Sequence, residues 1–192
     1  MRIISGEAGG RRLRAPRGAA TRPTADRVRE ALFNILGSAA GLSVLDLFAG
    51  TGALALEALS RGAAHAVLVD HAEAAVRVIH ANLAALGYAD RARVLRLDVE
   101  RALRLLAREG ARFDLIFVDP PYEGPVAAAA LAVLGEGSLL APDALVVVEH
   151  DAKNRPPSEQ GALCLGQRRK YGQTEVSLYQ AAGPAGSAPP SE

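Results

Sequence analysis

Apolar and polar positions follow two rhythms along most of this chain of 192 residues. From residue 43 onward, short and almost wholly apolar runs alternate with stretches whose apolar residues recur at helical spacing. The predicted strands are Ser43–Phe48, Ala66–Asp70, Ala92–Asp98, Phe113–Asp119 and Ala144–Glu149, and the predicted helices are Ala53–Arg61, Ala72–Leu86, Val99–Glu109 and Pro125–Leu134. Because helices join strands that are apolar on both faces, we expect a parallel, doubly wound sheet covered on both sides. The fold class is therefore α/β.

The N-terminal part of the chain has a different pattern. Residues 1–15 predict a small hairpin around a glycine-rich turn, with strands Arg2–Ser5 and Arg11–Ala15. After a Pro/Gly-rich linker at residues 16–23, apolar residues at helical spacing predict a helix over Ala25–Leu36, capped by Thr24. We therefore expect residues 1–37 to form a small extension of hairpin and helix.

The C-terminal part predicts a second hairpin. Ala162–Lys170 and Thr174–Gln180 are expected to pair as antiparallel strands, and Glu149-His150 before them is interpreted as closing the sheet. Residues 182–192 consist mainly of Gly, Pro, Ser and Ala and are expected to be disordered. The main domain is thus predicted to span residues 38–181.

Composition narrows the class of protein. No apolar run is long enough to span a bilayer and the first residues lack the apolar segment of a signal peptide, so we expect a cytoplasmic protein without a membrane partner. The single cysteine, Cys164, excludes an internal disulfide and is expected to be buried between two leucines. The four histidines show no ligand spacing, and we expect no metal site.

Charge is distributed unevenly. Residues 1–30 hold eight arginines and three acidic residues, so this part carries +5 although the whole chain carries +1. Arginine outnumbers lysine twenty to two, and its forked guanidinium suits phosphate groups. The basic end is a candidate surface for a nucleic-acid backbone, with a solvated tail as the alternative.

The first predicted strand ends in a glycine loop, Asp46-Leu-Phe-Ala-Gly50-Thr-Gly52, which opens a helix. Glycines let the backbone approach a ligand closely, and ligands of doubly wound sheets bind at the carboxyl ends of the strands. The second strand ends at Asp70, where a carboxylate can accept both hydroxyls of a ribose, and the third ends at Asp98, near the place of an adenine. His71 is a further candidate beside the ribose.

The same loop also fits the loose dinucleotide fingerprint, so a nucleotide dehydrogenase stays open. A dinucleotide brings a pyrophosphate to the helix N-terminus, where the carboxylate of Asp46 is unwelcome. Asp46 suits a cofactor with a cationic amine or sulfonium instead. The alternative is that Asp46 only caps the turn.

The fourth predicted strand ends in Asp119-Pro-Pro-Tyr122. The lone pair of an exocyclic base amine is drawn into the ring, and acceptors on both amine hydrogens make that amine more nucleophilic. The Asp119 carboxylate and the Pro120 carbonyl oxygen can supply the two acceptors, held in place by the rigid diproline. Tyr122 offers a face on which an extruded base can stack.

Together these motifs are similar to those of class I amino-methyltransferases, which use S-adenosylmethionine. Arg22-Pro-Thr-Ala-Asp-Arg-Val-Arg-Glu-Ala-Leu-Phe-Asn-Ile-Leu36 and Arg169-Lys-Tyr-Gly172 resemble the bacterial 16S rRNA (guanine(966)-N(2))-methyltransferase family, the RsmD type. The resemblance runs from Met1 to about Gln180 and departs from the family at Glu7-Ala8. It implies a Rossmann-like fold with a seven-stranded, mostly parallel sheet, a C-terminal antiparallel hairpin and the N-terminal extension.

The resemblance also implies a substrate and a set of site residues. We expect a monomer that methylates a guanine of 16S rRNA within the small ribosomal subunit or its assembly intermediate. The expected catalytic residues are Asp119, Pro120, Pro121 and Tyr122. Cofactor contacts are expected from Asp46, Phe48, Ala49, Gly50, Thr51, Gly52, Asp70, His71, Asp98, Val99 and Asp119. RNA contacts are expected from Arg11, Arg12, Arg22, Thr24, Arg27, Arg29, Arg169 and Lys170.

Two other functions remain open at this point. A DNA adenine-N6 methyltransferase uses the same Asp-Pro-Pro-Tyr chemistry, but it needs a larger target-recognition region than this chain has room for. A non-catalytic RNA-binding protein could use the same scaffold, although both Asp119 and Tyr122 are present.

Overall fold

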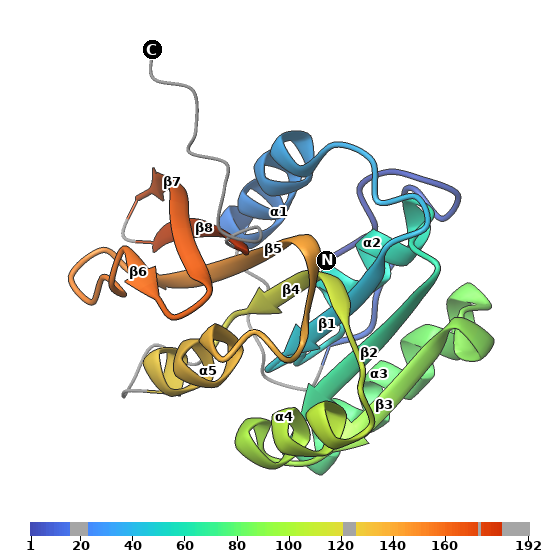
Figure 1. Ribbon diagram of the computed structural model, residues 1–192. Helices are drawn as coiled ribbons and strands as arrows, with labels where there is room; N and C mark the ends of the chain where they lie inside the picture. Colours follow the sequence, from blue (N-terminus) through green and yellow to red (C-terminus); the bar gives the residue numbers. More distant parts are fainter. Residues whose placement is uncertain (16–22, 121–125, 173, 182–192) are drawn as a thin grey trace.

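The computed structural model describes residues 1–15, 23–120, 126–172 and 174–181, with residues 23–27 described by their backbone (Figure 1). In these ranges a single sheet of eight strands runs in the order β3-β2-β1-β4-β5-β8-β7-β6. The chain moves outward from β1 to β3, then returns to the other side of β1 with β4. This reversal opens a crevice at the carboxyl ends of β1 and β4, the usual ligand position in doubly wound sheets.

Strands β1 to β5 are parallel to one another, whereas β5 with β8, β8 with β7 and β7 with β6 pair in antiparallel fashion. The parallel strands are β1 (Ser43–Leu47), β2 (His65–Asp70), β3 (Ala92–Arg96), β4 (Phe113–Val118) and β5 (Leu140–Asp151). The antiparallel strands are β6 (Glu159–Gln160), β7 (Leu163–Tyr171) and β8 (Thr174–Ala181). All of β1 is buried because helices cover both of its faces.

Helices form a layer on each face of the sheet (Figure 1). The core of one face is built with residues of α1 (Pro23–Leu36), α2 (Ala53–Ser60) and α3 (Glu73–Leu86). The core of the other face is built with residues of α4 (Val99–Arg108) and α5 (Val126–Gly135). A short 3-10 helix, η1 (Ala89–Arg91), precedes β3. Figure 1 thus confirms the predicted α/β class and the covering of the sheet on both sides.

The N-terminal segment, residues 1–14, packs against α2 and α3. The side chain of Glu57, which is 0% exposed, accepts hydrogen bonds from the backbone N–H groups of Ile4 and Ser5 at 2.7 and 3.0 Å. Farther along, the amide of Asn82 on α3 is hydrogen-bonded to the backbone N–H and C=O of Arg14 at 2.8 and 3.1 Å. The segment is therefore fixed by buried polar side chains of both helices.

These bonds explain why the predicted N-terminal hairpin is shorter than expected. Ile3 and Arg11 still pair through the backbone at 2.9 Å, but the only bridge in the described part of this segment joins Arg2 and Arg12. The N–H groups of Ile4 and Ser5 bond to Glu57, so they do not extend the pairing. The strands predicted over Arg2–Ser5 and Arg11–Ala15 are therefore wrong in length.

Four further predictions needed correction. Helix α1 begins at Pro23, so Thr24 lies in its first turn and does not precede it; proline is favoured at that first position. Strand β5 begins at Leu140, four residues before the predicted start. Its pairing with β4 is irregular there, and Asp143 adopts the left-handed conformation at φ 60°. The sheet gains an eighth strand, the two-residue β6 at its edge. Cys164 is exposed and not buried, since it lies on β7 beside this short edge strand.

The predicted tail, residues 182–192, lies outside the described residues. Among the residues that are described, no helix combines the length and apolar character needed to cross a membrane.

The buried carboxylate of Glu57 generates a stability prediction. It accepts a hydrogen bond from Arg61 at 2.9 Å and lies 3.8 Å from the buried guanidinium of Arg29. Glu57→Ala leaves these buried charges and backbone donors without that acceptor, and we expect a loss of about 3–5 kcal/mol in the free energy of unfolding. Urea denaturation measures the loss.

The matched control is Glu100→Ala on α4. Glu100 pairs with Arg104 at the surface, where its side chain is 64% exposed, and exposed pairs contribute about 0–1 kcal/mol. A Glu57→Ala variant as stable as this control would contradict the role of Glu57 as an anchor.

Candidate active site

The register of three parallel strands brings acidic side chains to one face of the sheet. Asp46 of β1 pairs with Phe117 of β4, and Phe117 pairs with Val147 of β5. Side chains alternate between faces along a strand, so Asp119 and Glu149, two residues farther along, point to the same face as Asp46. All three lie at the carboxyl ends of their strands, where β1 and β4 form the crevice.

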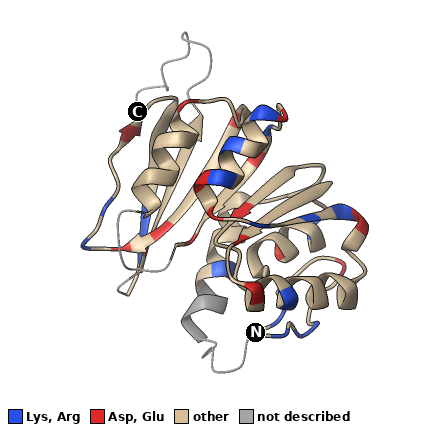
Figure 2. Ribbon diagram, turned by 90° about the horizontal axis from the view of Figure 1, so that it is seen from below, with Lys and Arg blue, Asp and Glu red and all other residues tan. Residues whose placement is uncertain are grey.

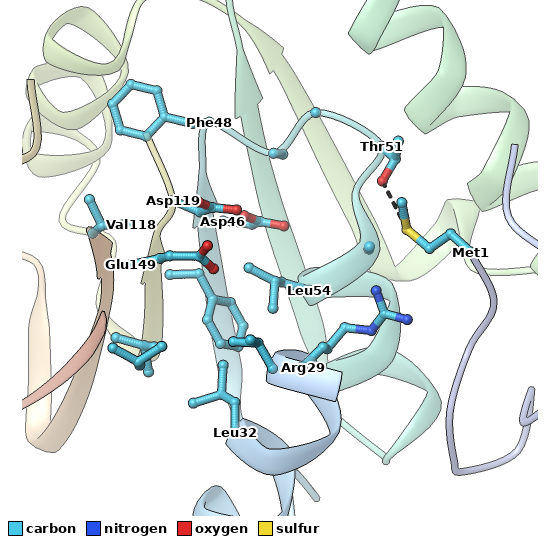
Figure 3. Close-up of a pocket in the computed structure, with 17 residues that line it drawn as sticks. Met1, Arg29, Leu32, Asp46, Phe48, Thr51, Leu54, Val118, Asp119 and Glu149 are labelled. Atoms are coloured by element: carbon cyan, nitrogen blue, oxygen red, sulfur yellow. Dashed lines mark hydrogen bonds between the residues drawn. The ribbon is translucent and has the colours of Figure 1, made fainter. Parts of the chain in front are cut away.

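These side chains line a cavity of about 190 Å³ between the sheet and α1. Figure 3 shows the carboxylates of Asp46, Asp119 and Glu149 close together at its centre, with Leu32 and Leu54 forming part of the wall. Phe117, Val147 and Val176 supply further apolar wall from the strands. The cavity thus combines a largely apolar wall with concentrated negative charge.

Asp46 is the most deeply buried of the three, with 1% of its surface exposed. Its carboxylate accepts a hydrogen bond at 3.1 Å from the backbone N–H of Ala55, in the first turn of α2. Burial raises the pKa of Asp46 from 3.8 to about 7; the bond to Ala55 opposes this shift and the charge of Asp70 adds to it. Asp46 therefore both bonds to the first turn of a helix and lines the cavity, and its contact with a cofactor stays a prediction.

Asp119 follows the last residue of β4, and Pro120 after it is buried. Burial raises the pKa of Asp119 well above 3.8, and the negative charges of Glu149 and Asp46 raise it further. Pro121 and Tyr122, the other two predicted catalytic residues, lie outside the described residues.

The glycine loop leads from β1 into α2 and is hydrogen-bonded to the end of β2. Asp70 accepts hydrogen bonds from the backbone N–H groups of Gly50 and Ala72, both at 2.8 Å. Phe48 adopts the left-handed conformation at φ 62°, unusual for an aromatic residue. This strained backbone turns the loop so that Phe48, Ala49, Gly50 and Thr51 all line the cavity.

The two glycines of the loop have different surroundings. A Cβ atom added to Gly50 would meet nothing closer than 3.9 Å, so its missing side chain leaves open space beside the cavity. A Cβ atom on Gly52 would lie 3.0 Å from Leu68 of β2. Gly50 therefore leaves room for a ligand, and Gly52 leaves room for the packing of α2 against β2.

A second cavity of about 520 Å³ lies on the other side of Phe48, between α4 and α5. Asp70, His71, Asp98 and Val99 line it, and Phe48 belongs to both cavities. Apart from Gly52, the predicted cofactor residues therefore lie on two adjoining cavities, although their contacts with a cofactor stay a prediction.

Asp98 has a structural role that the sequence reading did not include. It is the N-cap of α4 and accepts a hydrogen bond from the backbone N–H of Arg101 at 2.9 Å. A cap of this kind commonly stabilises a helix by about 1 kcal/mol. An aspartate three residues before Arg101, directly ahead of a helical pattern, was the available signal.

Among the described side chains, the exposed residues predicted to contact RNA lie on two different elements. Arg11 and Arg12 are exposed on the N-terminal segment, and Arg169 and Lys170 are exposed on β7. Figure 2 shows basic residues both in the segment next to the N-terminus and on distant elements. Arg22 lies outside the described residues, and Thr24 and Arg27 are described only by their backbone.

Arg29 corrects the sequence reading. It is 4% exposed, and its guanidinium donates to the backbone oxygen of Arg2 at 2.6 Å and lies beside Glu57. A surface contact between Arg29 and RNA is therefore wrong, because the side chain is enclosed between α1, α2 and the N-terminal segment. It lines the first cavity instead.

Glu149 is the site residue that the sequence reading missed. The pair Glu149-His150 was interpreted as closing the sheet, and this holds for His150, whose ring is 2.8 Å from the hydroxyl of Ser177 on β8. Glu149 points to the opposite face and lines the cavity. Glu149 comes two residues after the apolar Val147, so the period of two along a strand could have placed both side chains on one face. Over the described ranges, His, Cys, Asp and Glu form no group that could hold a metal ion.

Comparisons with known proteins agree with this geometry. The family model described as conserved hypothetical protein 95 matches residues 1–180. The putative rRNA methyltransferase YlbH of Bacillus subtilis is 41% identical, over 95% of this chain and 100% of its own. The ribosomal RNA small subunit methyltransferase D of Escherichia coli is 39% identical, over 94% of this chain and 89% of its own.

Two solved structures are similar to this one. A putative methyltransferase, yhhF, from Escherichia coli superposes with a TM-score of 0.81 at 37% identity, covering 96% of this chain and 99% of its own. The Thermus thermophilus 16S rRNA N2 G1207 methyltransferase RsmC, in complex with AdoMet and guanosine, superposes with a TM-score of 0.68 at 29% identity. That match covers 86% of this chain and 44% of RsmC.

The buried carboxyl of Asp46 predicts a pH-dependent stability. Since the folded pKa is about 7 and the unfolded value 3.8, the stabilising neutral form is lost as pH rises through 7. Between pH 5 and 8 this group alone removes about 3 kcal/mol from the free energy of unfolding. Asp46→Asn keeps an oxygen for the Ala55 N–H but cannot ionise, so we expect it to lose about 3 kcal/mol less than the wild type over that range.

Urea denaturation of the ligand-free protein at the two pH values measures this difference. Asp90→Asn, on the exposed side of η1, serves as the control that keeps the wild-type pH dependence. Equal losses in the wild type and Asp46→Asn would show that Asp46 is already ionised at pH 5.

Proposed function

We propose that this chain, which belongs to the conserved hypothetical protein 95 family, methylates the N2 amine of a guanine in 16S rRNA, expected to be guanine(966). The chain is an S-adenosylmethionine-dependent rRNA methyltransferase of the RsmD type, and the identity of the base and atom is the proposed part. One observation carries the proposal: Asp119, directly after β4, and Asp46 line one cavity together with residues of the glycine loop.

The residues present fit S-adenosylmethionine. Two cavities meet at Phe48, and Gly50 leaves open space at the wall of the first one. Asp70 lines the second cavity, and its carboxylate can accept from ribose hydroxyls because each of its oxygens has a second lone pair. The buried carboxylate of Asp46 favours a cation and opposes the pyrophosphate of a dinucleotide, which argues against a dehydrogenase.

When bound, S-adenosylmethionine supplies a methyl carbon on a cationic sulfonium; the base nitrogen gives its lone pair to that carbon while the carbon–sulfur bonding pair stays on sulfur. The residues of this chain position and activate the amine. The Asp119 carboxylate and the Pro120 carbonyl oxygen accept the two N2 hydrogens, which favours a nitrogen with an available lone pair. After transfer the amine carries a positive charge, and its proton passes to Asp119 or to water.

The electrostatics of the cavity support this role. Without a ligand, burial and then the negative charges of Glu149 and Asp46 favour a neutral Asp119, whose pKa lies well above 3.8. A cation placed among these groups lowers their mutual repulsion and favours the ionised forms. A positively charged ligand therefore favours the ionised form of Asp119, which accepts hydrogen bonds with both of its oxygens.

The RNA side of the proposal depends on exposed basic residues at the same edge. Lys170 is paired with Glu175 on β8 near the start of that strand, which in turn is paired with the carboxyl end of β5. Arg169 and Lys170 therefore lie at the edge of the sheet that holds the cavity. We propose them as phosphate contacts, with Arg11 and Arg12 as further contacts on the N-terminal segment.

The proposal is tested by Asp119→Ala. Methyl transfer from labelled S-adenosylmethionine to small ribosomal subunits that lack the modification should fall about 100- to 1000-fold, because a preorganised acceptor is lost. Mass mapping of the RNA identifies the modified base, and calorimetry should find that cofactor binding falls far less than methyl transfer. Asp90→Ala, far from the cavity and exposed, is the control that keeps the wild-type rate.

Two results would contradict this function. One is unchanged turnover in Asp119→Ala. The other is wild-type transfer to adenine in duplex DNA, with no methylguanine in rRNA, which would favour the DNA adenine-N6 alternative.

The glycine loop gives a second prediction. Both glycines have a positive φ, 57° for Gly50 and 78° for Gly52, so alanine at either position costs about 1 kcal/mol in backbone strain. Gly50→Ala also places a methyl group at the cofactor cavity, and we expect at least about tenfold weaker S-adenosylmethionine binding. Gly52→Ala crowds Leu68 and should lose more stability than Gly50→Ala.

Calorimetric titration and thermal melting of the two variants separate these effects. If Gly52→Ala weakened cofactor binding more than Gly50→Ala while melting at a higher temperature, the assignment of the two glycines would have to be reversed.

A further inference from the structure

Glu149 and Asp119 are neighbours across two adjacent parallel strands. Val118 of β4 pairs with Val148 of β5, and each acidic residue comes directly after its valine. Adjacent strands lie about 4.8 Å apart, and both side chains point to the face on which the cavity lies. Figure 3 shows the two carboxylates extending into the same space.

Glu149 is half-buried, with apolar neighbours and two other carboxylates around it. Val147 and Val176 beside it are buried, with 3% and 2% of their surfaces exposed. The carboxylates of Asp46 and Asp119 share the cavity with it, and like charges at close range destabilise one another. A carboxylate that lines the cavity beside Asp119 can accept a hydrogen bond from a ligand that enters it.

Guanine and adenine differ in the group next to the reactive amine. In guanine the N2 amine is next to N1–H, a second donor, so a carboxylate beside Asp119 meets a donor. In adenine the N6 amine is next to an unprotonated N1, whose lone pair would face that carboxylate. An acidic side chain accepts from a base donor and disfavours a base acceptor at the same place.

We propose that Glu149 is a specificity-determining residue that accepts a hydrogen bond from N1–H of the target guanine while Asp119 accepts from its N2 amine. This inference rests on the proposed function and adds the reason for which the site takes guanine and not adenine. It also explains why the third carboxylate comes from β5, the strand next to the Asp119-Pro120 end of β4 on the side away from the glycine loop.

The test uses small ribosomal subunits rebuilt with 16S rRNA that carries either guanine or 2-aminopurine at the target position. The analogue keeps the 2-amino group but has an unprotonated N1. Rates of methyl transfer from S-adenosylmethionine are measured for the wild type, Glu149→Gln, Glu149→Ala and the control Glu136→Gln, whose side chain is exposed after α5.

The expected readout is the ratio of the rates on guanine and 2-aminopurine. A hydrogen bond to a charged acceptor is worth about 10- to 100-fold, so the wild type and Glu136→Gln should prefer guanine by roughly that factor. Glu149→Ala should bring the ratio within about threefold of one. Glu149→Gln should lower this rate ratio or bring it below one, because the glutamine amide can donate to the unprotonated N1 of 2-aminopurine.

A ratio unchanged in both Glu149 variants would overturn the inference, even if both variants are slower. If Glu149→Ala does not fold, the isosteric Glu149→Gln alone decides between these outcomes. A wild type that modifies no guanine in the natural rRNA would overturn the proposed function and this inference together, whereas guanine methylation with an unchanged ratio removes only the role of Glu149.

Discussion

The pairing register of β1, β4 and β5 is the constraint on which the candidate site depends. Asp46, Asp119 and Glu149 come from positions 73 and 30 residues apart, and only the register Asp46–Phe117–Val147 puts them on one face. A slip of one residue in any of the three strands would turn its carboxylate to the opposite face. The strongly apolar strands prevent such a slip, since it would expose or misplace every buried side chain along them.

The second important feature is the attachment of the N-terminal segment to the glycine loop. The amide of Asn82 bonds to the backbone of Arg14 and also donates to the carbonyl oxygen of Thr51 at 3.0 Å. The hydroxyl of Thr51 lies 3.5 Å from the sulfur of Met1. The segment and the loop therefore share partners, so that the position of one depends on the position of the other. What the charge pattern suggested to be a basic extension is also part of the wall of the site.

Sequence reasoning succeeded where one local pattern decides the outcome. The continuous apolar runs gave the bounds of β1 to β4 to within a residue or two, and the glycine loop with Asp46 and Asp70 lies where the motif indicated. It failed where a distant partner decides. Arg29 is buried because Glu57, 28 residues away, balances its charge, and charge counting cannot show this. The strand β5 starts early because Pro142 and Asp143 are accommodated in an irregular pairing, although both residues normally argue against a strand. Placing Glu149 in the site requires the register between β4 and β5, which only the folded sheet shows.

The anchoring of residues 1–14 has a consequence for the order in which the protein is built. Ile4 and Ser5 bond to a carboxylate that lies 53 and 52 residues farther along the chain, and Arg14 bonds to an amide 68 residues farther along. Residues 1–14 are synthesised before α2 and α3, but they meet these partners only after both helices have been made and have folded against the sheet. The segment therefore reaches its native place after its partners, and the site is incomplete until it does.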